Sequence, residues 1–214
     1  MLIVPALLTL LLLVPATFFA RTVARGQKIE KGELFVDAAA FRRYAIGGAL
    51  AAAGYVDFAL IAFRFERDHL GSVASISLWF AGAMAIGAIA APVLGALLDR
   101  FGAIVVAPAL SLTALAVAMA FLGNGAVAFG GAVLWGAGTA VQDALLLALV
   151  SNVVGARKAT AFGIYDLIFG VAWFAGSALC GFLADHTLPG LVAFCVVMQV
   201  AAVPFFLQRP NVRA

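Results

Sequence analysis

Gly95-Ala-Leu-Leu-Asp-Arg-Phe-Gly102 is a short charged segment between two long apolar runs, Val73–Leu98 and Ala103–Leu122. An acid and a base that follow one another at such a place need contact with water. The segment therefore predicts a tight loop at a membrane surface, with a transmembrane helix on either side. We expect its two glycines to allow close approach of these helices.

The composition supports a membrane protein. Of the 214 residues, 65% are hydrophobic and 11% are charged, which is about half the charged fraction of a soluble domain. Runs of roughly 20 apolar residues match the hydrocarbon core of a bilayer, which only helices and closed barrels cross. We therefore expect an all-α integral membrane protein. The net charge of +3 comes from bases in loops, so it does not indicate nucleic-acid binding.

The apolar runs predict a bundle of about seven transmembrane helices. The first run is followed by a long mixed-charge loop, residues 21–43, and residues 44–214 form a six-helix domain. A signal peptide is the competing interpretation of the first run, residues 1–20, but its bases should precede the apolar core, and here they follow it. The predicted spans are Leu2–Ala20, Tyr44–Phe65, Val73–Leu98, Ala103–Leu122, Ala126–Val150, Ala159–Leu183 and Leu188–Phe206.

The distribution of basic residues predicts the orientation. With the N-terminus outside, seven spans put the C-terminus in the cytoplasm. All 13 Lys and Arg residues except Arg64 and Arg67 then lie on the inside, as the positive-inside rule requires. We therefore expect an integral protein of the plasma (inner) membrane whose 21–43 loop and charged turn are cytoplasmic.

A short motif recurs in the second half of the chain. Gly95-Ala-Leu-Leu-Asp99 returns as Gly181-Phe-Leu-Ala-Asp185, an offset of 86 residues (from 95 to 181). The first copy closes the third span on the inside, and the second copy closes the sixth span on the outside. This pattern predicts two three-helix repeats of opposite orientation, an architecture found in transporters. The match is short, so chance recurrence is the alternative.

The charged turn resembles the signature loop of the major facilitator superfamily. In addition, Gly155-Ala-Arg-Lys-Ala-Thr-Ala-Phe-Gly163 is similar to the basic loop that follows the tenth span of that family. The resemblance covers essentially the whole chain, which would align with the last seven of twelve spans, so that residues 44–214 correspond to the C-terminal half. It implies transmembrane transport of a small solute by a secondary transporter, with protons as a candidate coupling ion and alternating access as the mechanism.

The usual family member has two six-span halves with the transport pathway between them. The resemblance therefore implies a half that needs a partner N-terminal half or a second copy, as in a homodimer. The alternative is a truncated or degenerate half without transport activity, acting at most as a membrane interaction subunit. A seven-span receptor shares the outside N-terminus, but the repeat and the charged turn have no role in it.

Three acids lie inside predicted spans: Asp57, Asp143 and Asp166. A charge inside a bilayer is costly, so such acids are functional candidates by default. No Lys or Arg occurs at their depth, and loss of water favours the protonated form that a proton carrier needs. Asp57 and Asp143 are the leading candidates for proton coupling or for binding a cationic group, with Tyr55 and Gln142 as hydrogen-bonding neighbours. The alternative is that each acid is a structural hydrogen-bonding group.

Arg64 lies seven residues after Asp57 and therefore on nearly the same helix face, closer to the outer surface. It is a candidate for drawing an anionic solute inward. The alternative is that its side chain extends to the membrane interface.

The resemblance also implies a conformational latch at the charged turn. In the family this loop contacts neighbouring helix ends, whose amino ends carry partial positive charge. Asp185 would be the outer counterpart, with His186 in place of the base, and a simple solvated turn is the alternative. The candidate latch residues are Gly95, Asp99, Arg100, Gly102, Arg157 and Asp185.

No enzyme signature is present in the sequence. It has no phosphate-binding loop, no zinc-ligand spacing and no nucleophile–base pair, so we expect a non-enzyme without a metal or cofactor. Both cysteines, Cys180 and Cys195, lie in apolar runs and are interpreted as packing residues rather than a disulfide or metal pair.

Overall fold

The chain divides into two compact units, Met1–Gly32 and Glu33–Ala214, and the second is the subject of this description. The computed structural model describes residues 32–208. The predicted span Leu2–Ala20 and residues 21–31 of the predicted loop lie outside the described residues.

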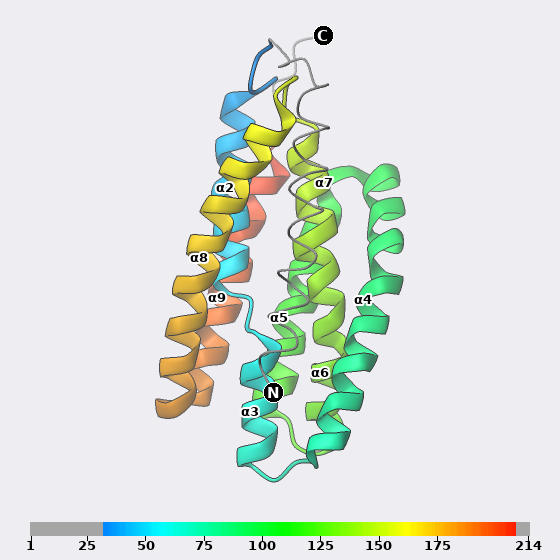
Figure 1. Cartoon of the computed structure of the whole chain (residues 1–214), viewed down its shortest axis with the longest axis vertical. Coiled ribbons are helices and arrows are strands. Elements are labelled where there is room, and N and C mark those ends of the chain that lie inside the picture. Colours follow the sequence, from blue (N-terminus) through cyan, green and yellow to red (C-terminus); the bar gives the residue numbers. More distant parts are fainter. Residues whose placement is uncertain (1–31, 209–214) are drawn as a thin grey trace, which may run out of the picture. The chain divides into compact units, whose positions relative to one another are not determined.

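The described residues are almost entirely helical (Figure 1), which confirms the predicted all-α class. A 3-10 turn, Gly102–Val105, joins α4 to α5, and a π segment, Val141–Leu145, joins α6 to α7. The only strand-like pairing among them is a single bridge between Phe35 and Val154. The α-helices are α2 (Ala38–Ala53), α3 (Phe58–Arg67), α4 (Val73–Phe101), α5 (Val106–Leu122), α6 (Ala126–Ala140), α7 (Leu146–Ser151), α8 (Lys158–His186) and α9 (Leu188–Leu207).

Five helical runs among the described residues are long and apolar enough to cross a membrane. One of them, Val73–Leu122, has 50 residues. At about 1.5 Å per residue it is roughly 75 Å long, more than twice the thickness of a hydrocarbon core, so it must contain a reversal. Gly102 provides it with a φ of 68°, and Figure 1 shows the chain turning back between α4 and α5. Divided at this reversal, the five runs give six apolar helical segments among the described residues.

The two glycines of the charged turn were predicted to allow close helix approach, and the structure gives this role to neither of them. Gly102 follows the C-terminus of α4 and its N–H donates to the carbonyl of Leu98, in a left-handed conformation that favours glycine. The prediction of close helix approach is wrong for both Gly95 and Gly102, because a Cβ at either position would meet nothing within 4 Å; Gly102 is instead required by the backbone conformation of the turn.

The helices pack in the pattern expected of an inverted repeat. The first repeat is α2–α3, α4 and α5, and the second is α6–α7, α8 and α9. Helix α2 packs against α8 and α9, while its counterpart α6 packs against α4 and α5. The third helices of the repeats, α5 and α9, pack against each other. Exchanging the two repeats thus maps these main contacts onto one another.

Glycines set the closest contacts at two corresponding interfaces. Where α6 meets α4, a Cβ on Gly136 would collide with the backbone of Ala83. Where α8 meets α2, a Cβ on Gly176 would collide with the backbone of Ala53. Small residues let membrane helices approach to backbone contact, so the second helix of each repeat lies tightly against the first helix of the other.

Two predicted spans are interrupted in the structure. The expected helix Tyr44–Phe65 begins earlier, at Ala38, and breaks between Ala53 and Phe58. The expected helix Ala126–Val150 passes through the π segment. Apolar periodicity does not reveal such breaks, because the interrupting residues are themselves apolar apart from Asp57, Gln142 and Asp143.

Candidate functional site

The break between α2 and α3 spans Gly54 to Asp57. It frees backbone carbonyls that a continuous helix would satisfy, and such groups are costly inside a bilayer. The carbonyl of Ala51 accepts hydrogen bonds from the side-chain amides of Gln142, at 3.4 Å, and Gln199, at 3.1 Å. The break is therefore stabilised from the second repeat.

The indole of Trp135 on α6 closes the same break. Its Nε1 donates to the carbonyl of Val56 at 2.6 Å, and the Tyr55 hydroxyl donates to the carbonyl of Trp135 at 3.1 Å. The two rings stack with centroids 5.3 Å apart. Both side chains are buried, so the two first helices of the repeats are fastened together at mid-length.

Asp57 occupies the N-cap position of α3 in an extended conformation, and its side chain does not cap the helix. Its carboxylate instead accepts a hydrogen bond from the Ser177 hydroxyl on α8, at 2.6 Å. Asp57 is half-buried. The break thus turns a carboxylate out of α3 and toward α8.

Asp143 lies in the π segment, and its side chain is exposed. It follows Asp57 by 86 residues (from 57 to 143), the same offset as the repeated motif. The two acids therefore hold corresponding positions in the two repeats, each where its helix departs from α geometry. Discontinuous helices with inverted symmetry mark the solute site of many transporters, and π segments are frequent at functional sites.

A cavity of about 780 Å³ lies at these two breaks. It brings together four of the six predicted pathway residues, Tyr55, Asp57, Gln142 and Asp143. Asp166, an exposed residue of α8, is not among the residues that line it. The other lining residues are Phe58, Ala59, Ala62, Ile76, Ser77, Phe80, Trp135, Thr139, Phe169 and Trp173.

Sequence reasoning missed the aromatic walls and Ser177. A signal was present: Trp135 and Thr139 precede Asp143 by eight and four residues, which places all three on one helix face. Phe169, Trp173 and Ser177 have the same spacing on α8. Counting back from Asp143 in steps of four would have found Trp135 and Thr139, whereas no intramembrane acid stands in the register of Phe169, Trp173 and Ser177.

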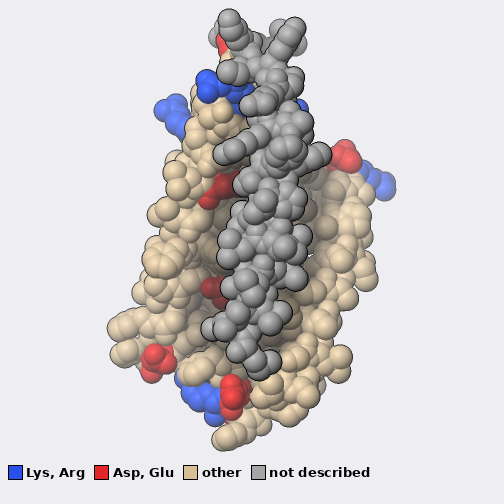
Figure 2. Space-filling model, viewed as in Figure 1, with Lys and Arg blue, Asp and Glu red and all other residues tan. Residues whose placement is uncertain are grey.

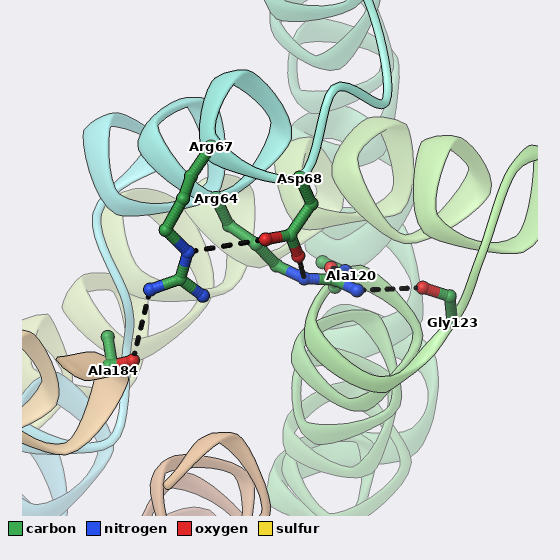
Figure 3. Close-up of polar contacts among 6 residues, drawn as sticks. All are labelled: Arg64, Arg67, Asp68, Ala120, Gly123 and Ala184. Atoms are coloured by element: carbon green, nitrogen blue, oxygen red, sulfur yellow. Dashed lines mark hydrogen bonds and ion pairs between the residues drawn. The ribbon is translucent and has the colours of Figure 1, made fainter. Parts of the chain in front are cut away.

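Arg64 does not reach the cavity, and Figure 3 shows where it points. Its guanidinium is buried and donates to the carbonyls of Ala120 and of Gly123, the latter at 3.0 Å, at the carboxyl end of α5. Its Nε pairs with Asp68 at 3.2 Å. A cation at a helix carboxyl end is favourable, so the structure places Arg64 as a cap of α5.

Arg67 extends the cluster of Arg64 and Asp68 at the carboxyl end of α3 to α8. Its Nε pairs with Asp68 at 3.2 Å, and its Nη1 donates to the carbonyl of Ala184 at 3.4 Å (Figure 3). Asp68 thus lies between two arginines that reach the ends of two different helices.

The latch residues lie near helix ends, and Asp99, Arg100, Arg157 and Asp185 are exposed. The Arg100 guanidinium lies over the Phe101 ring, 5.2 Å from its centroid. Among the described residues, no hydrogen bond or ion pair joins Asp99 to Arg157, so the latch stays a prediction.

The charge distribution separates the cavity from the helix ends. Figure 2 shows basic residues gathered toward the two ends of this face, whereas acidic surface also appears partway along it. Among the described residues that line the cavity, none is Lys, Arg or His.

Comparisons with known proteins agree with this architecture. The sequence profile described as Major Facilitator Superfamily matches residues 38–214. Uncharacterized proteins of Mycobacterium tuberculosis (strains H37Rv and CDC 1551) and Mycobacterium bovis are each 30% identical over 162 residues, which are 74% of this chain and 40% of each relative. The chain thus spans well under half the length of these curated relatives. No solved structure matches it.

Proposed function

The chain belongs to the major facilitator superfamily, whose members are membrane transporters, and we propose that it forms one half of a secondary transporter for a small solute. The half would work by alternating access, with its cavity exposed first to one side of the membrane and then to the other. A partner half or a second copy of the chain would supply the opposite wall of the pathway.

One observation carries the proposal: Asp57 and Asp143 hold corresponding positions in two inverted repeats, each at a helix discontinuity, and both line one cavity. None of the described lining residues is a base that could pair with these acids, and the protonated and charged forms of a carboxyl group differ greatly in their interaction with the bilayer interior. Proton binding and release at these acids would couple a pH gradient to the movement of the solute. Proton coupling is therefore part of the proposal.

Orientation and latch belong to the same proposal. The N-terminus would lie outside and the C-terminus in the cytoplasm of a plasma (inner) membrane, which puts the turn at Asp99 on the cytoplasmic side. Asp99 and Arg100 would then contact helix ends in one conformational state and release them in the other. The outer cluster around Arg64 would keep α3, α5 and α8 together during this change.

The test uses the full chain. Its mass is first measured in lipid nanodiscs, where we expect a dimer or a complex with a separate partner half. The assembly is then placed in proteoliposomes, and currents driven by a pH gradient are recorded on a solid-supported membrane with panels of amines, sugars and amino acids. Asp57→Asn and Asp143→Asn should each abolish the solute-dependent current while the protein stays folded.

A matched control is Glu66→Gln, which removes one negative charge from an exposed position at the outer end of α3. Its current should equal that of the wild type. A monomer with no solute-dependent current under any gradient would contradict the proposal and favour an interaction subunit.

A further inference from the structure

The described side chains that line the cavity have more free hydrogen-bond acceptors than free donors. Most of their donors already bind within the protein. Each of these donors is directed to a backbone carbonyl of the protein. They are the Tyr55 hydroxyl to Trp135, the Ser77 hydroxyl to Val73, the Trp135 indole to Val56, the Thr139 hydroxyl to Gly136 and the Gln142 amide to Ala51. Among the described lining side chains, two donors have no recorded bond: the Trp173 indole N–H and the second N–H of the Gln142 amide.

Acceptors, by contrast, remain available. Gln142 is only 4% exposed, and its buried side-chain oxygen has no hydrogen-bond partner among the described residues. The Asp143 carboxylate has no recorded bond within the described part of the chain, and Asp57 uses one oxygen for Ser177. A buried acceptor without a partner costs free energy, so a bound donor would be favoured here.

The charge of the cavity also favours a cationic hydrogen-bond donor. Two carboxylates face it, and among residues 32–208 the only opposing feature is the amino end of α3, which carries roughly half a positive charge. With both acids ionised, the local charge is therefore negative by more than one unit. An anionic solute would be repelled, and a cation would be attracted.

The remaining walls are apolar and aromatic. Phe58 packs against Phe80 and Trp135, with ring centroids 4.8 Å and 5.4 Å apart. Phe80 and Trp173 expose 42% and 41% of their surface. Aromatic faces attract cations and bind apolar groups, and a volume of about 780 Å³ suits a drug-sized molecule.

We propose that this cavity binds protonated amines that carry a bulky aromatic or apolar body. The ammonium N–H groups would donate to Asp57, Asp143 and the Gln142 oxygen, and the body would lie against Phe80 and Trp173. This inference rests on the proposed function in that it takes the cavity as the solute site, but it concerns equilibrium binding and not movement.

The acceptor excess also separates ammonium from other head groups. A trimethylammonium group has the charge but no N–H donor, an alcohol has one donor but no charge, and a carboxylate has the wrong charge. Ligands that share one body and differ only in the head group therefore test the proposal directly.

The test is calorimetric titration of the full chain in lipid nanodiscs, with empty nanodiscs as the blank for partition into lipid. The probes are diphenylpropylamine, diphenylpropyltrimethylammonium, diphenylpropanol and diphenylpropionate. We expect saturable binding of the amine, weaker binding of the trimethylammonium compound, and affinities about 10- to 100-fold lower for the alcohol and the carboxylate. Equal affinity of amine and alcohol would overturn the proposal.

Variants locate the bound amine. Asp143→Asn and Asp57→Asn should each weaken amine binding about 10- to 100-fold and leave the alcohol unaffected, whereas Glu66→Gln should change neither. Trp173→Leu keeps an apolar side chain at an exposed position, and it should weaken amine binding about threefold. Amine affinity that survives loss of both acids, in protein shown to be folded by circular dichroism, would contradict the proposal.

The two proposals fail separately. Amine binding with the expected selectivity, but without any current driven by a pH gradient, supports the inference and contradicts the transport proposal. A current with another solute that depends on Asp57 and Asp143, without saturable amine binding, supports transport and overturns the inference.

Discussion

The two helix breaks at the cavity hold corresponding positions in the two repeats, yet they are built differently. In the first repeat, Gly54 to Asp57 leave the helix altogether, and side chains from α6, the π segment and α9 satisfy the freed carbonyls. In the second repeat, Val141–Leu145 stays helical and merely widens into a π turn. The two repeats of this protein therefore share the location of a helix discontinuity but differ in its backbone geometry.

The acids at the two breaks differ in the same way. Asp57 is half-buried and bound to Ser177, whereas Asp143 is exposed. Both carboxylates line the cavity, but Asp57 is bonded to a protein hydroxyl and Asp143 has no recorded bond among the described residues. The difference teaches that one acid, Asp57, is held by the protein while the other, Asp143, is left to exchange partners in the cavity. Four predictions sharpen or break this comparison.

The largest effect should come from Trp135, which fastens the first break. Trp135→Ala removes a buried ring and leaves the carbonyl of Val56 without its donor, so it should lower the free energy of unfolding by about 3–5 kcal/mol. Trp173→Ala, at a partly exposed position in the same cavity, should cost about 1 kcal/mol. Unfolding is followed in detergent by tryptophan fluorescence. If both variants lost the same free energy of unfolding, the Trp135 indole would not stabilise the helix break.

The two glutamines should behave non-additively. Gln142→Leu or Gln199→Leu leaves the other amide bound to the carbonyl of Ala51, so each should cost about 1 kcal/mol or less. The double variant leaves that carbonyl unsatisfied and should exceed the sum of the two by about 1–3 kcal/mol. A double-mutant cycle of unfolding free energies measures this term. An additive result would show that water or another group replaces both amides.

Ser177 should matter more than Thr139, although both hydroxyls lie near an acid. Ser177→Ala removes a bond to a carboxylate and should cost about 1.5–3 kcal/mol, whereas the hydroxyl of Thr139 bonds only its own helix at Gly136. Thr139→Val should therefore stay within about 0.5 kcal/mol. The same unfolding assay compares them, and the reverse order would remove the distinction between a fixed and an exchangeable acid.

The smallest effect concerns accessibility. In single-cysteine replacements, Asp143→Cys should react with a water-soluble thiol reagent several-fold faster than Asp57→Cys, since Asp143 is exposed and Asp57 is half-buried. The native Cys180 and Cys195 are 1% and 0% exposed, so background labelling should be low. Labelling rates are read by mass spectrometry, and faster reaction at position 57 would reverse the assignment.

Much of the fold was predictable from apolar length alone. Helices α4, α5 and α9 begin and end within a few residues of the predicted bounds. The acids inside predicted spans were selected because a charge inside a bilayer costs free energy, and two of these three acids line the cavity. In each case the prediction needs only the polarity of the segment itself relative to the bilayer and no knowledge of its tertiary contacts.

The helix break and the role of Arg64 were not predictable in this way. The bonds that stabilise the break join residues 79, 91 and 148 positions apart, and the carbonyl that Arg64 caps lies 56 positions away. No local pattern reports such partners. The offset that links Asp57 to Asp143 was, however, readable from the sequence once the repeated motif had set its length.

The long-range stabilisation of the first break has a consequence for biosynthesis. When α2 and α3 leave the ribosome, the carbonyls of Ala51 and Val56 have no donors until Trp135, Gln142 and Gln199 are made. At typical translation rates this interval is on the order of ten seconds. During it the segment must remain a continuous helix, or stay within the insertion machinery, and its unwinding is then a late step of assembly that only the completed second repeat permits.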